Sequence, residues 1–332
     1  MVALLAGLLY PATAASAQPL SPRVSAAAAR SAIVLGAPGG AIPVSPDTYR
    51  ATEGQLGRHL AAIRMYARWD TPFPDATSIW ARDNGRRVLL SVKAGTRAGR
   101  PVLYRDIAAA TPGTAIYGDI SRWAQSLHTF GAPIFFTFNH EPEGAGSVQS
   151  GTAAEYVAAW RRIVAVFEKS GVTNVSYMFI GTGNGFNPKI ARPVLPYYPG
   201  DDVVDAIGAD AYNWYTCRVT PSNPWRSLAD LLEPLRQFGL AHPTKDLWVA
   251  EFASAEDPAV PGRKAQWVAD TQALFAKPGY SSFAGVLIWY GVVPDSQCRF
   301  RIDSSPTALL AYRALAQAQY YSGTSAALAS AR

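Results

Sequence analysis

The sequence lacks the residues from which metal centres, serine nucleophiles and nucleic-acid surfaces are usually built. Its 332 residues include only two cysteines and four histidines, and no two histidines have a spacing such as H-x-x-x-H, so no metal and no cofactor are expected. No G-x-S-x-G segment marks a serine nucleophile. The 30 basic residues, mostly arginine, are scattered, and the net charge of +6 therefore does not predict a nucleic-acid partner.

Long hydrophobic runs are also missing beyond the first residues, so no membrane association is expected after processing. Residues 1–17 resemble a secretory signal peptide, with a short apolar core and an Ala15-Ser16-Ala17 cleavage pattern. The positive segment that normally opens such a signal is missing, so we expect the true start to lie upstream. Residues 18–30, rich in Pro, Ser and Ala, predict a flexible lead-in, and residues 319–332 a disordered tail. A secreted, extracellular protein is expected.

The expected export from the cell bears on the state of the two cysteines. In an oxidising compartment, Cys217 and Cys298 are expected to form one disulfide, and both lie in predicted loops. The alternative is a pair of free thiols.

The body of the chain alternates between short apolar runs and segments with helical periodicity. This alternation predicts an α/β fold, a (β/α)8 TIM barrel forming a single catalytic domain over residues 31–318. An open doubly wound sheet is the alternative, but no glycine-rich phosphate loop follows an early strand. Nothing requires more than a monomer. The predicted strands are Ile33–Gly36, Ala62–Trp69, Val88–Lys93, Ile134–Phe138, Val175–Ile180, Val203–Ala209, Leu247–Glu251 and Phe283–Tyr290, and the predicted helices are Thr52–Leu60, Asp119–Phe130, Thr152–Ser170, Ser227–Phe238, Arg263–Phe275 and Ser305–Ala316. The connections 70–87 and 181–202 have less helical character.

Two of the apolar runs end in acidic residues. FTFNHEPEG, from Phe136 to Gly144, carries Glu141, and LWVAEFAS, from Leu247 to Ser254, carries Glu251. In a barrel of parallel strands, residues at strand C-termini face the active site. We therefore expect both glutamates at one mouth of the barrel. Each alone has a simpler explanation, as a capping or salt-bridged residue.

More polar and aromatic residues fall at the same strand ends. Asp210, Tyr212 and Trp214 close the sixth strand region, and Trp289 the eighth. Aromatic rings stack on the apolar faces of sugars, and a pair of carboxyls in different protonation states can cleave a glycosidic bond. The pattern therefore predicts a polysaccharide substrate, with Glu141 and Glu251 as the reacting pair.

These segments resemble glycoside hydrolase family 26, a family of retaining (β/α)8 enzymes. The resemblance rests on His140-Glu141, on the block YPGDDVVD–IGADAYNW from Tyr198 to Trp214, on Val249-Ala250-Glu251-Phe252 and on Trp289, and it covers roughly residues 33–317. Histidine before the first glutamate is what this family has, whereas many related families have asparagine.

The resemblance implies a role for each matching residue. Glu141 would be the general acid/base and Glu251 the nucleophile of a double displacement. His140 would bind sugar hydroxyls, Tyr212 would orient the nucleophile, and Trp289 would stack under the sugar. Asp210 and Trp214 would bind substrate, although Asp210 has an alternative role as a loop anchor.

The resemblance implies a secreted endo-β-glycosidase acting on β-1,4-mannan. Family mannanases often carry a Met-Asn-Gly and Trp-rich segment after the acid/base, whereas residues 142–147 here are Pro-Glu-Gly-Ala-Gly-Ser. Mixed-linkage β-glucan and β-1,3-xylan therefore stay open as substrates. A non-catalytic polysaccharide-binding barrel is the alternative from another class, and a lyase acting on uronates is a third, which the excess of arginine would suit.

Overall fold

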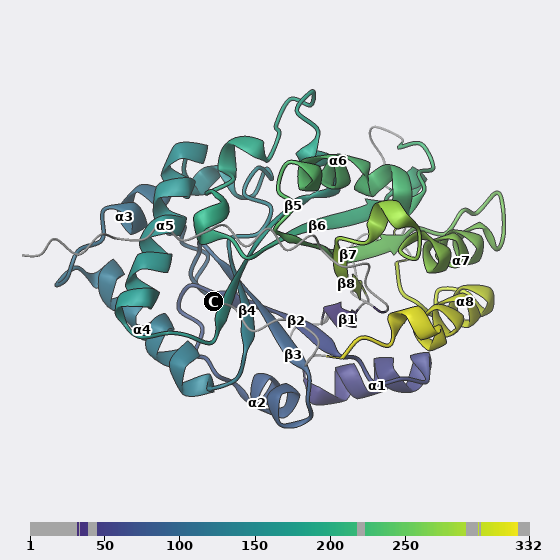
Figure 1. Cartoon of the computed structure of the whole chain (residues 1–332), viewed down its shortest axis with the longest axis horizontal. Helices are drawn as coiled ribbons and strands as arrows, with labels where there is room; N and C mark the ends of the chain where they lie inside the picture. Colours follow the sequence, from purple (N-terminus) through teal and green to yellow (C-terminus); the bar gives the residue numbers. More distant parts are fainter. Residues whose placement is uncertain are drawn as a thin grey trace, which may run out of the picture.

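The computed structural model describes residue 32 and residues 34–38, 45–217, 223–289, 298 and 300–324. Its strands form one closed parallel barrel in sequence order, ringed by helices (Figure 1). The predicted fold is confirmed. The signal peptide, residues 1–17, and the lead-in, residues 18–30, lie outside the described residues. The eight strands are β1 (Val34–Pro38), β2 (Ala62–Arg68), β3 (Arg87–Lys93), β4 (Ile134–Phe138), β5 (Val175–Thr182), β6 (Ala206–Asn213), β7 (Asp246–Ser254) and β8 (Phe283–Ile288).

All six predicted helices are present. They are α1 (Pro46–Leu56), α4 (Ala115–Phe130), α5 (Ala153–Lys169), α6 (Leu228–Leu240), α7 (Arg263–Leu274) and α8 (Pro306–Gln317). The start predicted for α1, Thr52, was wrong by more than one turn: the helix begins at Pro46, because proline suits the first helical position, and Gly57 ends it in the left-handed conformation.

Two further helices were not predicted. The connection 70–87 contains α2 (Ala76–Asp83), which begins with a reciprocal cap between Asp75 and Ser78. The five-residue α3 (Tyr104–Ala108) packs against α5. Both are too short to show helical periodicity in the sequence. The connection 181–202 contains only single 3-10 turns, as its weak helical pattern indicated.

The ends of β6 and β7 differ from the prediction in a way that affects the site. Residues 201–203 form a 3-10 turn, so β6 begins at Ala206 and continues to Asn213, and β7 continues to Ser254. Tyr212 therefore lies inside β6, not after it, and Glu251 lies inside β7, not at its last position. A register shift next to Asp210 pairs this residue with Glu251 across the two strands.

The barrel interior is apolar at one end and charged at the other. Trp248 and Phe135 fill the apolar end, with ring centroids 5.1 Å apart. Gly285 makes room for this filling, because a Cβ at that position would lie 2.3 Å from the Trp248 ring. A larger apolar layer joins the outside of the barrel to the helices. The polar site therefore sits above a packed plug.

The end of the chain is more ordered than the predicted tail from residue 319. Gln319–Tyr321 form a 3-10 turn, the Tyr321 side chain is fully buried, and its hydroxyl donates to the carbonyl of Thr271 at 2.9 Å. Gly323 pairs with Val34 of β1. Burial of an aromatic ring accounts for this order, and the tail boundary at 319 was wrong. Among the helices described, none has the length and apolar character needed to cross a membrane.

Candidate active site

Glu141 lies in a sharply turned segment directly after β4. Asn139 and Glu141 both have left-handed backbone conformations, with φ of 44° and 51°. The turn is held from several sides: the Glu141 amide donates to the carbonyl of Ile180 at 2.8 Å, and the Asn139 side chain accepts from the amide of Ala94 at 3.1 Å. Non-glycine residues in this conformation are strained and persist where the surroundings fix them. Here the hydrogen bonds that hold the turn also set the direction in which the Glu141 side chain leaves the backbone.

The surroundings of Glu141 favour its protonated form. Burial raises the pKa of this carboxyl to about 7, and the negative charge of Glu251 adds to the rise, whereas Lys93 and Arg64 oppose it. A carboxyl with a pKa near neutrality can donate a proton and take one back.

Glu251 has the opposite environment, although it too is buried. One carboxylate oxygen accepts from the Tyr66 hydroxyl and the other from the Tyr212 hydroxyl. The Arg64 guanidinium lies 2.9 Å from the same carboxylate. A guanidinium and two hydroxyl donors stabilise the ionised carboxylate and hold it in one orientation.

Arg64 also joins Glu251 to Asp210. Its guanidinium is 2.7 Å from the Asp210 carboxylate, and both side chains are fully inaccessible to solvent. Asp210 therefore lies below the surface of the site, paired with an arginine, and it holds Arg64 against Glu251. Asp210 is among the residues that line the larger cavity, but its carboxylate is bound to Arg64, so both the substrate-binding role and the loop-anchor alternative stay predictions.

His140, Asp210 and Glu251 each offer a ligand atom within 4.8 Å of the others. Arg64 already occupies two of the three, so a cation would have to compete with its guanidinium. The His140 side chain is buried, and burial, together with the charges of Lys93 and Arg64, lowers its pKa well below the usual range. Its Nδ1 has no hydrogen-bond partner within the described residues. This nitrogen is itself buried, and His140 is not among the residues that line the two cavities described below.

The predicted aromatic residues gather beside Glu251. Trp289 lies 6.0 Å from Tyr212 and 6.2 Å from Tyr66, edge-on in both cases, measured between ring centroids. Trp214 packs on Tyr212 at 5.1 Å. The Trp289 indole nitrogen has no partner in the part of the chain that the structure describes. These rings form a wall on which a sugar ring can stack.

The disulfide between Cys217 and Cys298 is present, with 4.7 Å between the Cα atoms. This prediction is confirmed. The two cysteines follow β6 and β8, and they pack with Phe300 in the same cluster as Tyr212, Trp214 and Trp289. The bridge therefore braces the aromatic wall.

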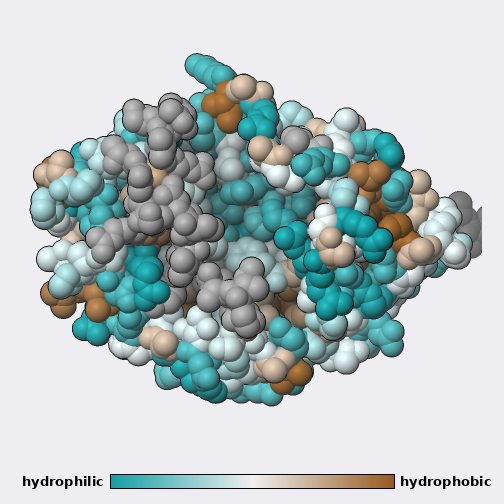
Figure 2. Space-filling model, turned by 180° about the vertical axis from the view of Figure 1, so that it is seen from behind, coloured by the Kyte–Doolittle hydropathy of each residue, from teal (hydrophilic) through white to brown (hydrophobic). Residues whose placement is uncertain are grey.

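Two cavities meet at Glu141. The larger, of about 710 Å³, is lined by Glu141, Glu251, Asp210 and the aromatic wall. The smaller, of about 300 Å³, lies on the other side of Glu141. Both include Gly144 and Ala145. Figure 2 shows a face that is hollowed near its centre, where the visible residues are hydrophilic. The glutamates thus line one polar depression at the C-terminal ends of the strands.

Several residues of the site were not predicted. Arg64 and Tyr66 stand at alternate positions of β2 and reach Glu251 together. A charged residue inside the apolar strand was the available signal, because a buried arginine needs a partner. Glu143 is buried and accepts from the amide of Thr182 at 2.7 Å, which fixes the loop after β4 to the end of β5.

A closed (β/α)8 barrel with two differently held glutamates and an aromatic wall at the C-terminal ends of its strands is the arrangement expected of a glycoside hydrolase. Comparisons with known proteins agree with that class. The profile of glycosyl hydrolase family 26 matches residues 113–243. This match lies within the part of the chain whose motifs resemble glycoside hydrolase family 26, and it supports that prediction.

Individual relatives share parts of the chain. Endoglucanase H of Acetivibrio thermocellus is 29% identical over 286 residues, which cover 81% of this chain but only 29% of that protein. An endo-β-1,4-mannanase from Cellulomonas fimi superposes with a TM-score of 0.62 at 19% identity, covering 90% of this chain and 73% of the other. A family 26 β-mannanase from Bacteroides ovatus gives 0.59 at 14% identity, covering 88% and 90%. At these identities the structures establish the fold alone.

Proposed function

We propose that this protein is a retaining endo-β-glycosidase in which Glu141 is the general acid/base and Glu251 the nucleophile. The observation that carries the proposal is the contrast between the two carboxyls that line one cavity. Burial raises the pKa of Glu141 to about 7, whereas Glu251 is held by Arg64 and two tyrosine hydroxyls.

In the first step, Glu141 gives its proton to the glycosidic oxygen while Glu251 attacks the anomeric carbon. The leaving sugar departs and a covalent glycosyl-enzyme remains. Loss of the proton from Glu141 prepares the second step, in which this carboxylate takes a proton from water. The water then displaces Glu251 at the same carbon, and two inversions give net retention.

The other residues bind and orient. Tyr66 and Tyr212 restrain both oxygens of Glu251, so that attack comes from a fixed direction. Trp289 and Trp214 supply the stacking wall, and His140 lies behind it against Tyr66, with ring centroids 5.5 Å apart. Asp210 holds the Arg64 guanidinium in its position against Glu251.

β-1,4-Mannan is the first substrate that we propose, since the solved family structures include endo-β-1,4-mannanases. Mixed-linkage β-glucan is the second candidate. The curated relative is named an endoglucanase, and the segment after Glu141 has no aromatic residue. β-1,3-Xylan completes the set to be tested.

Product analysis on these three polymers tests the proposal. The enzyme is expected to release reducing ends from at least one polymer. Proton NMR during the reaction should show the β-anomer of the product before the α-anomer, as expected for a retaining enzyme. Glu251→Ala should abolish turnover. For Glu141→Ala, azide should restore part of the activity on a substrate with an activated leaving group, because azide replaces the water that Glu141 would have deprotonated. Binding of these polymers without release of reducing ends would instead support the non-catalytic barrel.

The same proposal includes export from the cell. The signal-like residues 1–17 and the Cys217–Cys298 disulfide are what support it. Detection of the protein in the culture medium, cleaved after residue 17, is the direct measurement.

A further inference from the structure

Four cations line the two cavities that meet at Glu141. Some arginines elsewhere on the surface, such as Arg97, Arg161 and Arg236, each form an ion pair with an aspartate or glutamate. The two cavities are lined by Arg68, Lys93, Arg192 and Arg226, and none of these forms an ion pair within the described residues. Positive charge is therefore left unpaired in the groove.

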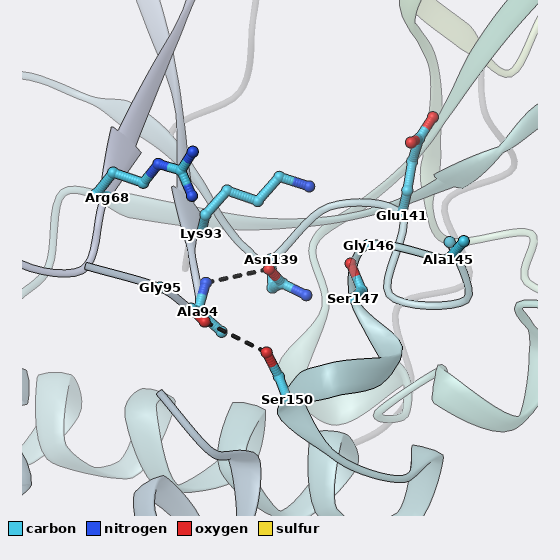
Figure 3. Close-up of a pocket in the computed structure, with 11 residues that line it drawn as sticks. Arg68, Lys93, Ala94, Gly95, Asn139, Glu141, Ala145, Gly146, Ser147 and Ser150 are labelled. Carbon is cyan, nitrogen blue, oxygen red and sulfur yellow. Dashed lines mark hydrogen bonds between the residues drawn. The ribbon is translucent and has the colours of Figure 1, made fainter. Parts of the chain in front are cut away.

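The smaller cavity holds two of these cations next to Glu141. Lys93 extends from the end of β3 across the pocket towards Glu141, and Arg68 stands beside it at the end of β2 (Figure 3). The Lys93 ammonium donates to the carbonyl of His140 at 3.1 Å, which leaves two of its three protons for a ligand. Arg68 is exposed, and among the residues described its guanidinium has no carboxylate partner.

The opposite wall of this pocket is built from small residues. Gly144, Ala145, Gly146 and Ser147 line it, and Ser150 lies at its base. This is the segment that has no aromatic side chain after the acid/base. A wall without rings offers little stacking for a neutral sugar, whereas a fork of one guanidinium and one ammonium suits a carboxylate. The pocket chemistry thus differs from the aromatic wall on the other side of Glu141.

We propose that the pocket of Arg68, Lys93 and residues 144–147 binds a carboxylate-bearing sugar unit next to the cleaved bond, so that the substrate is an acidic β-glycan. This inference rests on the proposed hydrolase function and specifies its substrate class. The carboxylate could belong to a uronate ring or to an acidic substituent on a neutral ring.

Affinity electrophoresis tests the proposal independently of turnover. The gels contain galactomannan or mixed-linkage β-glucan, each in three forms: neutral, oxidised at C6 to uronate units, and carboxymethylated. Wild-type protein is compared with Arg68→Gln. Arg100→Gln is the matched control, because Arg100 is an exposed arginine of the loop after β3 that does not line the pocket. Both variants lose one positive charge, so general attraction to a polyanion falls equally in the two.

Wild-type protein is expected to bind at least one acidic form about tenfold more tightly than its neutral parent, with a preference that falls as salt is added. Arg68→Gln should lose most of that preference and Arg100→Gln should keep it. Preference for the C6-oxidised form identifies a uronate, and preference for the carboxymethylated form an acidic substituent. Equal binding of neutral and acidic forms, or equal losses in the two variants, would overturn the inference. Release of reducing ends from the neutral polymers is scored separately and reports only on the proposed hydrolase function.

Discussion

Replacing Glu141 with glutamine keeps the size of the side chain and removes its ionisation. In the wild-type protein, the fold raises the pKa of Glu141 from 4.5 to about 7. The folded state therefore binds this proton more tightly than the unfolded chain does. Below pH 4.5 the carboxyl is protonated in both states. As the pH rises to about 7, only the unfolded chain releases the proton readily, so the free energy of unfolding falls.

The size of this effect follows from the two pKa values. A rise from 4.5 to about 7 corresponds to roughly 3 kcal/mol of stability that is present in acid and lost by pH 8. Glu141→Gln has no such titration. Its free energy of unfolding, relative to that of the wild type, should therefore increase by up to roughly 3 kcal/mol between pH 4.5 and pH 8. The same loss of the proton should lower wild-type kcat/KM above about pH 7.

Chemical denaturation of both proteins across this pH range measures the difference directly. Glu233→Gln is the control, because Arg236 and Gln237 lower the pKa of Glu233 to about 2. Its titration lies below the window, so its stability relative to wild type should stay constant between pH 4.5 and pH 8. A constant difference for Glu141→Gln as well would show that Glu141 ionises like an ordinary glutamate, and the acid/base assignment would lose its physical basis.

Three other perturbations have definite outcomes. Tyr212→Phe removes a hydrogen bond to Glu251 and should lower kcat by roughly tenfold to a hundredfold at unchanged fold, which steady-state kinetics and circular dichroism measure together; an unaltered kcat would contradict the orienting role. Arg64→Met leaves two buried carboxylates without their cation and should cost about 3–5 kcal/mol in the free energy of unfolding, so denaturation curves that match wild type would contradict the network. Reduction of the Cys217–Cys298 bridge should lower stability by about 2–4 kcal/mol, and thiol titration of the unfolded, unreduced protein should find no free thiol.

The barrel could be predicted because its strands are covered on both faces. Such strands appear as short continuous apolar runs, and all eight were located by that property. Their ends were less predictable. Tyr212 lies within β6 because the strand continues through polar residues that pair with β7 beyond the apolar run. A polar residue at a strand end and a polar residue outside the strand look the same in a sequence.

The residues of the site could be predicted only where a residue stood out from its own neighbours in the sequence. Glu141 and Glu251 were identifiable because each interrupts an apolar run, and the family motifs added roles for their neighbours. Arg64 and Tyr66 were missed, since their importance comes from contacts with β6 and β7, far away in the sequence. The unpaired cations of the groove were missed for the same reason: arginines are scattered along the chain, and only folding separates paired from unpaired ones.

The network around Arg64 explains how one barrel can hold two glutamates in different states. Burial favours the protonated form of Glu141 and raises its pKa. Among the carboxylates of the described residues, Arg64 forms ion pairs with Glu251 and Asp210, and its charge also opposes the rise in the pKa of Glu141. The ionised Glu251 then raises the pKa of Glu141 further. The two glutamates are therefore held differently: Glu251 is bound by Arg64, Tyr66 and Tyr212, whereas Glu141 has no such donors among the residues described and feels the charge of Glu251.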